Sequence, residues 1–282
     1  LDTAHRHLER RVHHFDFDVT GGHSNLERLI AAARTRYARV GALLAGRFVA
    51  GLAASKFKVK GLPAQRTTFK RFVEPARVAG KCAYILVDAL RWEMARELSQ
   101  SLPEGYEVEL NPTVGTLPSV TEVGMAALLP RADSEAALLA AGSGKVALQI
   151  DGKLLTNGKQ RLEFLSEVVG GKVHTTRLES LLPPSKKEKE AVGAAGFVVV
   201  TAVDELDGLC ESGNVPMARR MMDDVLVQIR RGLRVLFDLG VGTAIVASDH
   251  GFLFGEALDA GLLIDPPGGQ TVDLHRRVWV GR

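Results

Sequence analysis

The chain is poor in cysteine: its 282 residues include two, Cys82 and Cys210. They form no CxxC pair and no disulfide-scaffold spacing, which excludes a small secreted domain stapled by disulfides and indicates a reducing compartment. A signal peptide is also missing, and Arg, Gly or Asp interrupts the apolar runs before they reach membrane-spanning length. These absences predict a soluble, cytoplasmic protein that has no membrane partner.

An excess of charge of one sign is missing as well, since the net charge is +3. That value is too small to indicate nucleic-acid binding by itself. The basic residues are uneven, because residues 56–81 hold eight Lys and Arg against the single acidic Glu74. This stretch is either a solvated linker or a contact for a phosphate backbone. The hydrophobic content of 46% is enough for a large core.

The first part of the chain predicts a helical arm. After Ser24, apolar residues recur at helical spacing as far as Leu44. Residues 52–80 then carry Gly61, Pro63, Pro75 and the basic stretch without sustained periodicity, which indicates a boundary. We therefore predict a helical arm and basic linker over residues 1–79 and a core domain over residues 80–282.

From Cys82 onward, apolar runs alternate with helical patterns, as they do in α/β proteins. The runs that predict strands are Cys82–Asp88, Tyr106–Leu110, Gly196–Thr201 and Thr243–Ser248. The patterns that predict helices are Arg91–Leu98, Ser119–Leu129 and Met217–Leu239, with Lys186–Glu190 as a charged loop. The expected fold is a three-layer α/β/α domain with a mostly parallel sheet. The chain starts without Met and stops after a strand-like run, which indicates a piece of a longer protein.

Polar residues follow several of these strands. Asp88 ends the first strand, Thr116 follows the second, Asp207 follows the third, and Asp249 and His250 end the fourth. Functional groups of open α/β sheets gather at the carboxyl ends of the strands. Aspartate and histidine are ligands that zinc and manganese use, so together these residues predict a divalent-metal site. Taken singly, Asp88 could cap a helix and Thr116 could be an ordinary turn residue.

The segment Thr116–Ser119 lies immediately before an apolar helix, so the Thr116 side chain is expected near backbone amides that can hold a phosphate oxygen. Its hydroxyl is a poor nucleophile, but a metal ion on the oxygen would stabilise the alkoxide. At the metal site, Gly251 lets the backbone leave the crowded region without a Cβ atom.

The sequence pattern indicates a functional role less specifically for a second group of residues. Glu211 follows Asp207 by four residues, which places both carboxylates on one face of a helical turn. They could instead cap a helix. His275 precedes Arg276 and Arg277, which are fit to hold a phosphate, although a surface histidine is the alternative.

The order of these motifs resembles the alkaline phosphatase superfamily. The amino-acid sequences of residues 87–93, 116–121 and 127–130 are specifically similar to those of the PglZ family of BREX phage-defence systems. The resemblance covers about residues 80–282 and leaves residues 1–79 uncovered. It implies the alkaline-phosphatase type of sheet for the core domain.

The resemblance also implies roles for the candidate residues. One metal ion would be held by Asp88, Thr116, Asp249 and His250. The second ion would be held by Asp207, Glu211 and His275. Glu211 stands where the superfamily more often has histidine, which favours manganese or magnesium over zinc. Ser119 and Thr121 are alternative nucleophiles, and Ser119 with Arg276 and Arg277 could bind phosphate.

The implied activity is a two-metal in-line displacement in which Thr116 attacks phosphorus. Because the resemblance implies defence against phage, a nucleotide or nucleic-acid phosphodiester is favoured as the substrate over a small sugar phosphate. The resemblance also implies partners that include a DNA methyltransferase and other BREX subunits. The main alternative is a catalytically silent scaffold that holds metal and assembles these subunits. A phosphoglycerate-mutase-like transferase is a further alternative, for which the sequence shows no product pocket.

Overall fold

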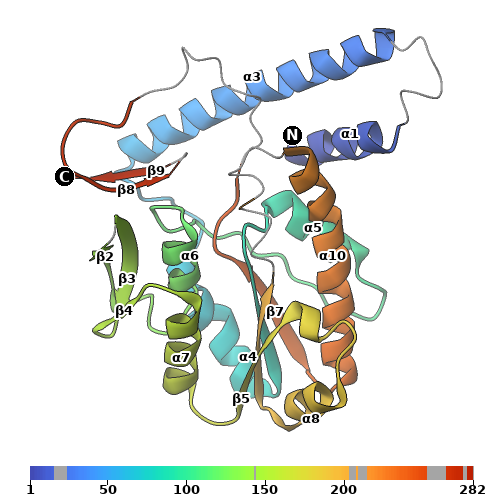
Figure 1. Ribbon diagram of the computed structural model, residues 1–282, viewed down its shortest axis with the longest axis vertical. Helices are drawn as coiled ribbons and strands as arrows, with labels where there is room; N and C mark the ends of the chain where they lie inside the picture. Colours follow the sequence, from blue (N-terminus) through green and yellow to red (C-terminus); the bar gives the residue numbers. More distant parts are fainter. Residues whose placement is uncertain are drawn as a thin grey trace.

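The computed structural model describes residues 1–15, 24–142, 144–202, 208, 215–252, 265–275 and 278–281. A four-stranded parallel sheet lies at its centre in the order β5-β6-β1-β7 (Figure 1). Its strands are β1 (Cys82–Val87), β5 (Val173–Arg177), β6 (Phe197–Ala202) and β7 (Thr243–Ser248). Every residue of β1 is buried, as expected for a strand covered on both faces.

Helices cover both faces of this sheet, and this confirms the predicted three-layer α/β fold. One face is covered by α5 (Trp92–Ser101), α8 (Lys186–Ala194) and α10 (Val215–Asp238). The other face is covered by α4 (Glu74–Ala79), α6 (Thr121–Ala127), α7 (Gly158–Val169) and the π-helical turn η2 (Phe69–Val73). Within β1, Ile85 packs into the first core and Tyr84 into the second. Each such large buried side chain contributes about 1.5–3 kcal/mol relative to exposure.

Two smaller sheets were not predicted from the sequence. An antiparallel sheet of β2 (Ala136–Gly142), β3 (Lys145–Ile150) and β4 (Lys153–Leu155) lies beside α6 and α7 (Figure 1). A hairpin of β8 (Thr271–His275) and β9 (Val278–Gly281) packs next to β3.

The predicted helical arm consists of α1 (Asp2–His14) and α3 (Ser24–Ala54), which lie at one end of the molecule (Figure 1). Most of α3 is exposed, with Ile30 and Tyr37 as its buried apolar contacts. Helix α3 is long and apolar enough to cross a membrane, which corrects our expectation that no segment reaches that length. One such helix is weak evidence for a membrane span, because soluble proteins also contain helices of this kind.

Three local predictions were wrong. Tyr106–Leu110 is not a strand: Val108 and Leu110 are exposed, and the segment makes no ladder with the described strands. Lys186–Glu190 is not a loop, because it begins α8, where the Ser185 hydroxyl accepts a hydrogen bond from the backbone N–H of Glu188.

The third wrong prediction concerns the linker. Residues 65–79 form η1 (Gln65–Thr67), η2 and α4 rather than irregular chain. Phe69 and Val73 of this segment are buried in the same core as Tyr84 of β1. Apolar side chains spaced three and four residues apart drive this packing. The segment therefore belongs to the core, while the division of the chain into an arm and a core domain stays a prediction.

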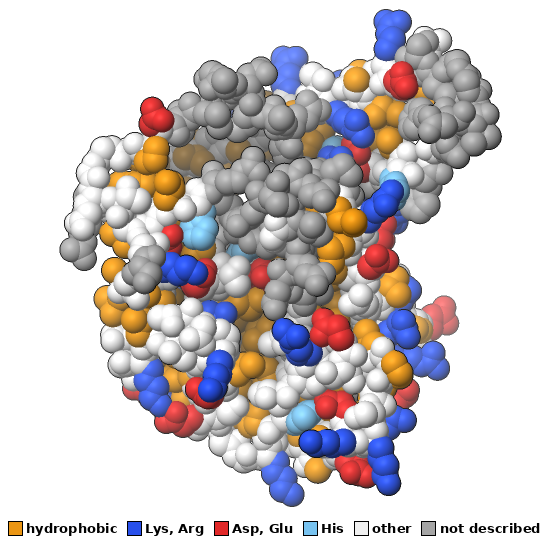
Figure 2. All heavy atoms as spheres, in the orientation of Figure 1, with side chains coloured by type: hydrophobic (Ala, Val, Ile, Leu, Met, Phe, Trp, Pro, Cys, Tyr) orange, Lys and Arg blue, Asp and Glu red, His pale blue; other side chains and the backbone are white. Residues whose placement is uncertain are grey.

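Several residues of the basic stretch have structural contacts. Lys70 forms an exposed ion pair with Asp133 at 3.0 Å. The Arg77 guanidinium lies over the Phe197 ring, and Lys81 donates a 2.7 Å hydrogen bond to the carbonyl of Leu239 after α10. On the face shown in Figure 2, Lys and Arg side chains are interspersed with Asp and Glu rather than gathered in one patch.

Candidate metal centre

Asp88, Asp249 and His250 form a buried cluster at the carboxyl edge of the sheet. Strands β1 and β7 are parallel neighbours, with Val87 paired to Ser248, so the residues that follow them meet at the same edge. One ligand atom from each of the three residues lies within 4.8 Å of the other two. His250 Nε2 is 3.4 Å from Asp249 Oδ2 and 3.8 Å from Asp88 Oδ1. The structure thus brings together three of the predicted metal ligands.

The Asp249 carboxylate is held by backbone groups. Its Oδ1 accepts hydrogen bonds from the N–H of Ala89 at 2.9 Å and the N–H of His250 at 2.8 Å. Ala89 has a φ of 52°, a left-handed conformation that costs an alanine about 1–2 kcal/mol. Burial raises the pKa of Asp249, against the opposing effect of the His250 charge and these two N–H groups. A cation beside the carboxylate would favour its ionised form.

Helix α6 approaches this cluster so closely that only a glycine fits at the contact. A Cβ atom on Gly124 would lie 2.6 Å from the carbonyl oxygen of Asp249 and 2.9 Å from its Cβ. A Cβ on Gly251, in contrast, would meet the Cα of Arg91 at an ordinary 3.8 Å. The glycine that close approach requires is therefore Gly124, and our prediction for Gly251 was wrong. A glycine inside a short apolar helix was the sequence signal for this contact.

Gln65, which was not predicted as a site residue, connects the Thr116 loop to the cluster. It is buried, and its Nε2 donates hydrogen bonds to the carbonyls of Ser248, at 3.0 Å, and Asp249. Its Oε1 accepts a 2.9 Å hydrogen bond from the backbone N–H of Thr116. The position of the Thr116 backbone is thereby coupled to the end of β7. A lone glutamine in a stretch rich in Gly and Pro gave no signal of this role.

The three candidate hydroxyls differ in their surroundings. Thr116 is half-buried in its loop and lies just before the cis peptide bond between Leu117 and Pro118. Ser119 is also half-buried. Thr121 Oγ1, on the first residue of α6, lies 3.4 Å from His250 Nε2. The fold therefore places the Thr121 hydroxyl directly beside the cluster.

A cavity of about 1000 Å³ borders the cluster and gives room for a substrate. It extends along β7 from residue 242 to residue 251, so Asp249 and His250 lie in its wall. Aromatic side chains also line it, namely Phe72, Trp92, Tyr106 and Phe237.

The second predicted ligand set is only partly visible. Asp207, Glu211, Arg276 and Arg277 lie outside the described residues. His275 is on β8, where its Nε2 lies 3.3 Å from Oδ1 of Asp273. The other oxygen of Asp273 accepts a 3.1 Å hydrogen bond from the backbone N–H of Val146 in β3. His275 is thus outside the three-residue cluster, and its role as a ligand of a second ion stays a prediction.

A parallel α/β/α domain with buried Asp, Asp and His side chains at its carboxyl edge is consistent with the class of alkaline phosphatase-like domains. The family model for the BREX system PglZ alkaline phosphatase-like domain matches residues 68–260, which is more than half of the chain. The chain belongs to this family.

Two curated relatives agree with this assignment. The chain is 37% identical over 79 residues to the alkaline phosphatase-like protein BrxZ of Escherichia coli O9:H4 (strain HS). It is 37% identical over 75 residues to the alkaline phosphatase-like protein PglZ of Bacillus cereus (strain H3081.97). Each match covers 26% of this chain and 9% of the relative, so the chain matches a small part of these longer proteins.

Proposed function

We propose that this domain is a divalent-metal-dependent hydrolase of phosphodiesters, with nucleotides or nucleic acid as its substrate class. The observation that carries the proposal is the buried cluster of Asp88, Asp249 and His250 at the edge of the sheet. Two carboxylates and an imidazole within ligand reach of one another suit zinc, manganese or magnesium. Membership of an alkaline phosphatase-like family supports hydrolysis as the reaction class.

The residues of the cluster fit a metal ion. Asp88 and Asp249 are buried within 4 Å of the His250 imidazole, so a cation among them would offset the cost of ionising carboxylates away from water. When bound, a divalent ion would polarise the phosphate and favour the ionised form of an attacking hydroxyl. The chain itself fixes the ligands. The backbone N–H groups of Ala89 and His250 donate hydrogen bonds to the Asp249 carboxylate, and Gly124, which has no Cβ, allows α6 to approach Asp249 closely.

Thr116 is the proposed nucleophile. Its oxygen loses its proton and forms the new bond to phosphorus, while the leaving alcohol departs with the electron pair of the broken P–O bond and takes up a proton. Water then hydrolyses the threonine phosphodiester that remains and frees the Thr116 hydroxyl. The Gln65 tether, which fixes the backbone of this loop beside Asp249, supports the assignment. The rival nucleophile is Thr121, because its hydroxyl lies 3.4 Å from His250 Nε2.

The second ion site remains part of the proposal. It would use Asp207, Glu211 and His275, while Ser119, Arg276 and Arg277 would contact the phosphate. For the location we propose the cytoplasm. For the partners we propose other BREX subunits, including a DNA methyltransferase, on the support of the BREX description of the family. A metal-holding scaffold without catalysis is the alternative function.

Asp249→Asn tests the function through the cluster. The variant should hydrolyse bis(p-nitrophenyl) phosphate at least about 100-fold more slowly than the parent, since losing even an outer partner of a metal ligand costs about 10–100-fold. Rates are measured with manganese, zinc and magnesium in turn. Asp151→Asn, on an exposed aspartate in the turn between β3 and β4, is the matched control and should keep the parent rate. A parent that retains metal and yet hydrolyses nothing would establish the scaffold.

A further inference from the structure

One aromatic side chain in the cavity beside the metal centre is open to a flat ligand. Trp92, the first residue of α5, lines that cavity and is 47% exposed, although tryptophan is highly buried on average. The other aromatic rings of the described wall are half-buried. Tyr106 and Phe237 pack on each other with ring centroids 5.2 Å apart, and the Arg71 guanidinium lies over the Phe72 ring. Trp92 is therefore the most exposed aromatic ring of the described wall.

Trp92 is close to the metal centre both along the chain and in space. It follows Asp88 by four residues. The Cα of its neighbour Arg91 lies 3.8 Å from the position of a Cβ atom on Gly251, which comes directly after His250 of the cluster. The cavity that joins the two has a volume of about 1000 Å³, enough for a nucleotide-sized ligand. We therefore expect one such ligand to reach from the metal centre to the Trp92 ring.

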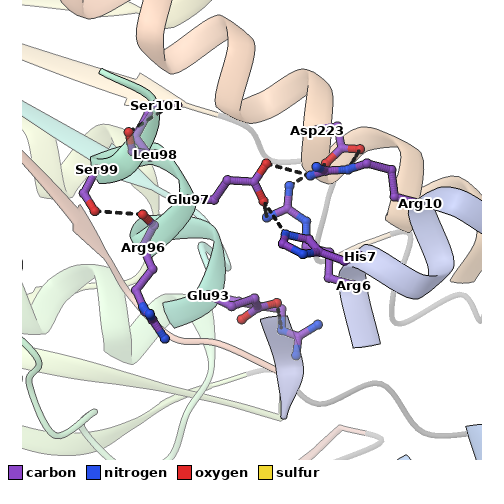
Figure 3. A network of polar contacts seen from close by, with 11 residues as sticks. Arg6, His7, Arg10, Glu93, Arg96, Glu97, Leu98, Ser99, Ser101 and Asp223 are labelled. Atoms are coloured by element: carbon purple, nitrogen blue, oxygen red, sulfur yellow. Dashed lines mark hydrogen bonds and ion pairs between the residues drawn. The ribbon is translucent and has the colours of Figure 1, made fainter. Parts of the chain in front are cut away.

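Helix α5 holds Trp92 in a fixed place. Met94 is fully buried in the core on this face of the sheet. Glu97 accepts a 2.7 Å hydrogen bond from Arg10 of α1, toward which it points in Figure 3. Trp92 and Ala95 are three residues apart on another side of the helix, and both line the cavity. A ring that is already fixed loses little conformational freedom when a ligand binds to it.

The charges of the cavity wall favour an uncharged group in the part away from the metal. Glu107 and Glu109 are exposed in this wall, and Arg71 is the one Lys or Arg among its described residues. A groove that follows a nucleic-acid backbone is positively charged instead. The wall thus suits a neutral nucleoside beside a phosphate that is held at the metal centre.

We infer that Trp92 stacks on the base of a nucleotide whose phosphate is held at the metal centre. Every base has an aromatic face, so stacking on an indole ring is favourable without selection among the bases. The inference rests on the proposed hydrolysis of phosphodiesters and narrows the substrate class to phosphodiesters of a nucleoside. Trp92 determines specificity rather than chemistry, because it contacts a part of the substrate that does not react.

Two substrates with the same leaving group test the stacking contact. They are the p-nitrophenyl phosphodiesters of thymidine and of methanol, which differ only in the group that would meet Trp92. In Trp92→Ala we expect about tenfold higher KM for the thymidine ester with nearly unchanged kcat, because stacking is made in the ground state and the transition state alike. The methyl ester should be hydrolysed at the parent rate. Trp92→Phe keeps an aromatic ring and should recover part of the loss.

Gln100→Ala, on an exposed residue near the other end of α5, is the matched control and should keep both KM values. Because Trp92 is exposed, Trp92→Ala should also unfold at nearly the parent temperature. The inference is overturned if Trp92→Ala leaves KM for the thymidine ester unchanged. It is equally overturned if KM rises by the same factor for both esters, since the nucleoside would then not be the group that Trp92 contacts.

A binding measurement decides the inference even for a protein that hydrolyses neither ester. Trp279, the other tryptophan of the chain, lies on β9, where its Nε1 donates a 3.1 Å hydrogen bond to the Thr271 hydroxyl. In Trp279→Phe the tryptophan fluorescence comes from Trp92 alone. Adenosine monophosphate, added with magnesium, should quench this fluorescence saturably because its base stacks on the indole, whereas ribose phosphate should not.

The absence of saturable quenching by adenosine monophosphate overturns the inference, and so does equal quenching by ribose phosphate. The proposed function is decided separately by the methyl ester, which has no base. A parent protein that hydrolyses the methyl ester while adenosine monophosphate leaves Trp92 unquenched would keep the proposed function and lose the stacking contact. Saturable quenching in a protein that hydrolyses neither ester would do the reverse.

Discussion

Thr116→Ala is expected to lower the rate of phosphodiester hydrolysis by about 10³-fold or more while the fold and most of the metal affinity remain. The expected loss is large because the covalent route disappears together with the nucleophile. An ordinary lost hydrogen bond would cost only about 1 kcal/mol, which is roughly fivefold in rate. The rates of parent and variant are compared at saturating metal, so that a weaker metal affinity is not mistaken for lost chemistry.

Two further variants make this prediction specific. Thr116→Ser should keep part of the activity, since it preserves a hydroxyl at the same position. Thr121→Ala removes the hydroxyl that lies 3.4 Å from His250 Nε2 and is the matched comparison. If Thr121→Ala or Ser119→Ala is inactive and Thr116→Ala hydrolyses at the parent rate, the nucleophile has been assigned to the wrong residue.

Gly124→Ala should destabilise the metal-free protein by about 2 kcal/mol, even though alanine favours helix by about 1 kcal/mol. The added Cβ would lie 2.6 Å from the carbonyl oxygen of Asp249, so α6 or the end of β7 has to move. That oxygen belongs to a backbone held by Gln65 and cannot move as the end of a flexible side chain does. Denaturant unfolding with chelator present measures the loss, and metal content should fall with it.

Gly46→Ala is the matched control for this substitution. Gly46 lies in helix α3, and a Cβ atom there would meet nothing within 4 Å, so alanine should stabilise the protein or leave its stability unchanged. If Gly124→Ala were as stable as Gly46→Ala and kept its metal, the close approach of α6 to Asp249 would play no part in forming the centre.

The central part of the fold could be predicted because β1 and β6 are buried apolar runs, and β7, although half-exposed, is apolar over residues 244–247. Polar residues directly follow β1 and β7. The position of Asp88 next to Asp249 and His250 follows from the rule that parallel strands end at one edge. The neighbour relation of β1 and β7 itself is set by long-range pairing, which the local sequence does not encode.

The predictions that failed have different physical causes. Edge strand β5 (Val173–Arg177) is mostly polar and half-exposed, so it lacks an apolar run. In Tyr106–Leu110 the alternating pattern is present, but a strand also needs a neighbour to pair with. Gln65 acts through hydrogen bonds to chain segments far away in the sequence, and only the folded structure shows them.

The central claim is that Asp88, Asp249 and His250 hold one divalent ion. A crystal of the protein grown with manganese, with anomalous scattering measured, locates the ion directly. The account predicts an anomalous peak roughly 2.0–2.6 Å from a carboxylate oxygen of each aspartate and from a ring nitrogen of His250. Manganese bound elsewhere, with these three side chains free of it, would contradict the account.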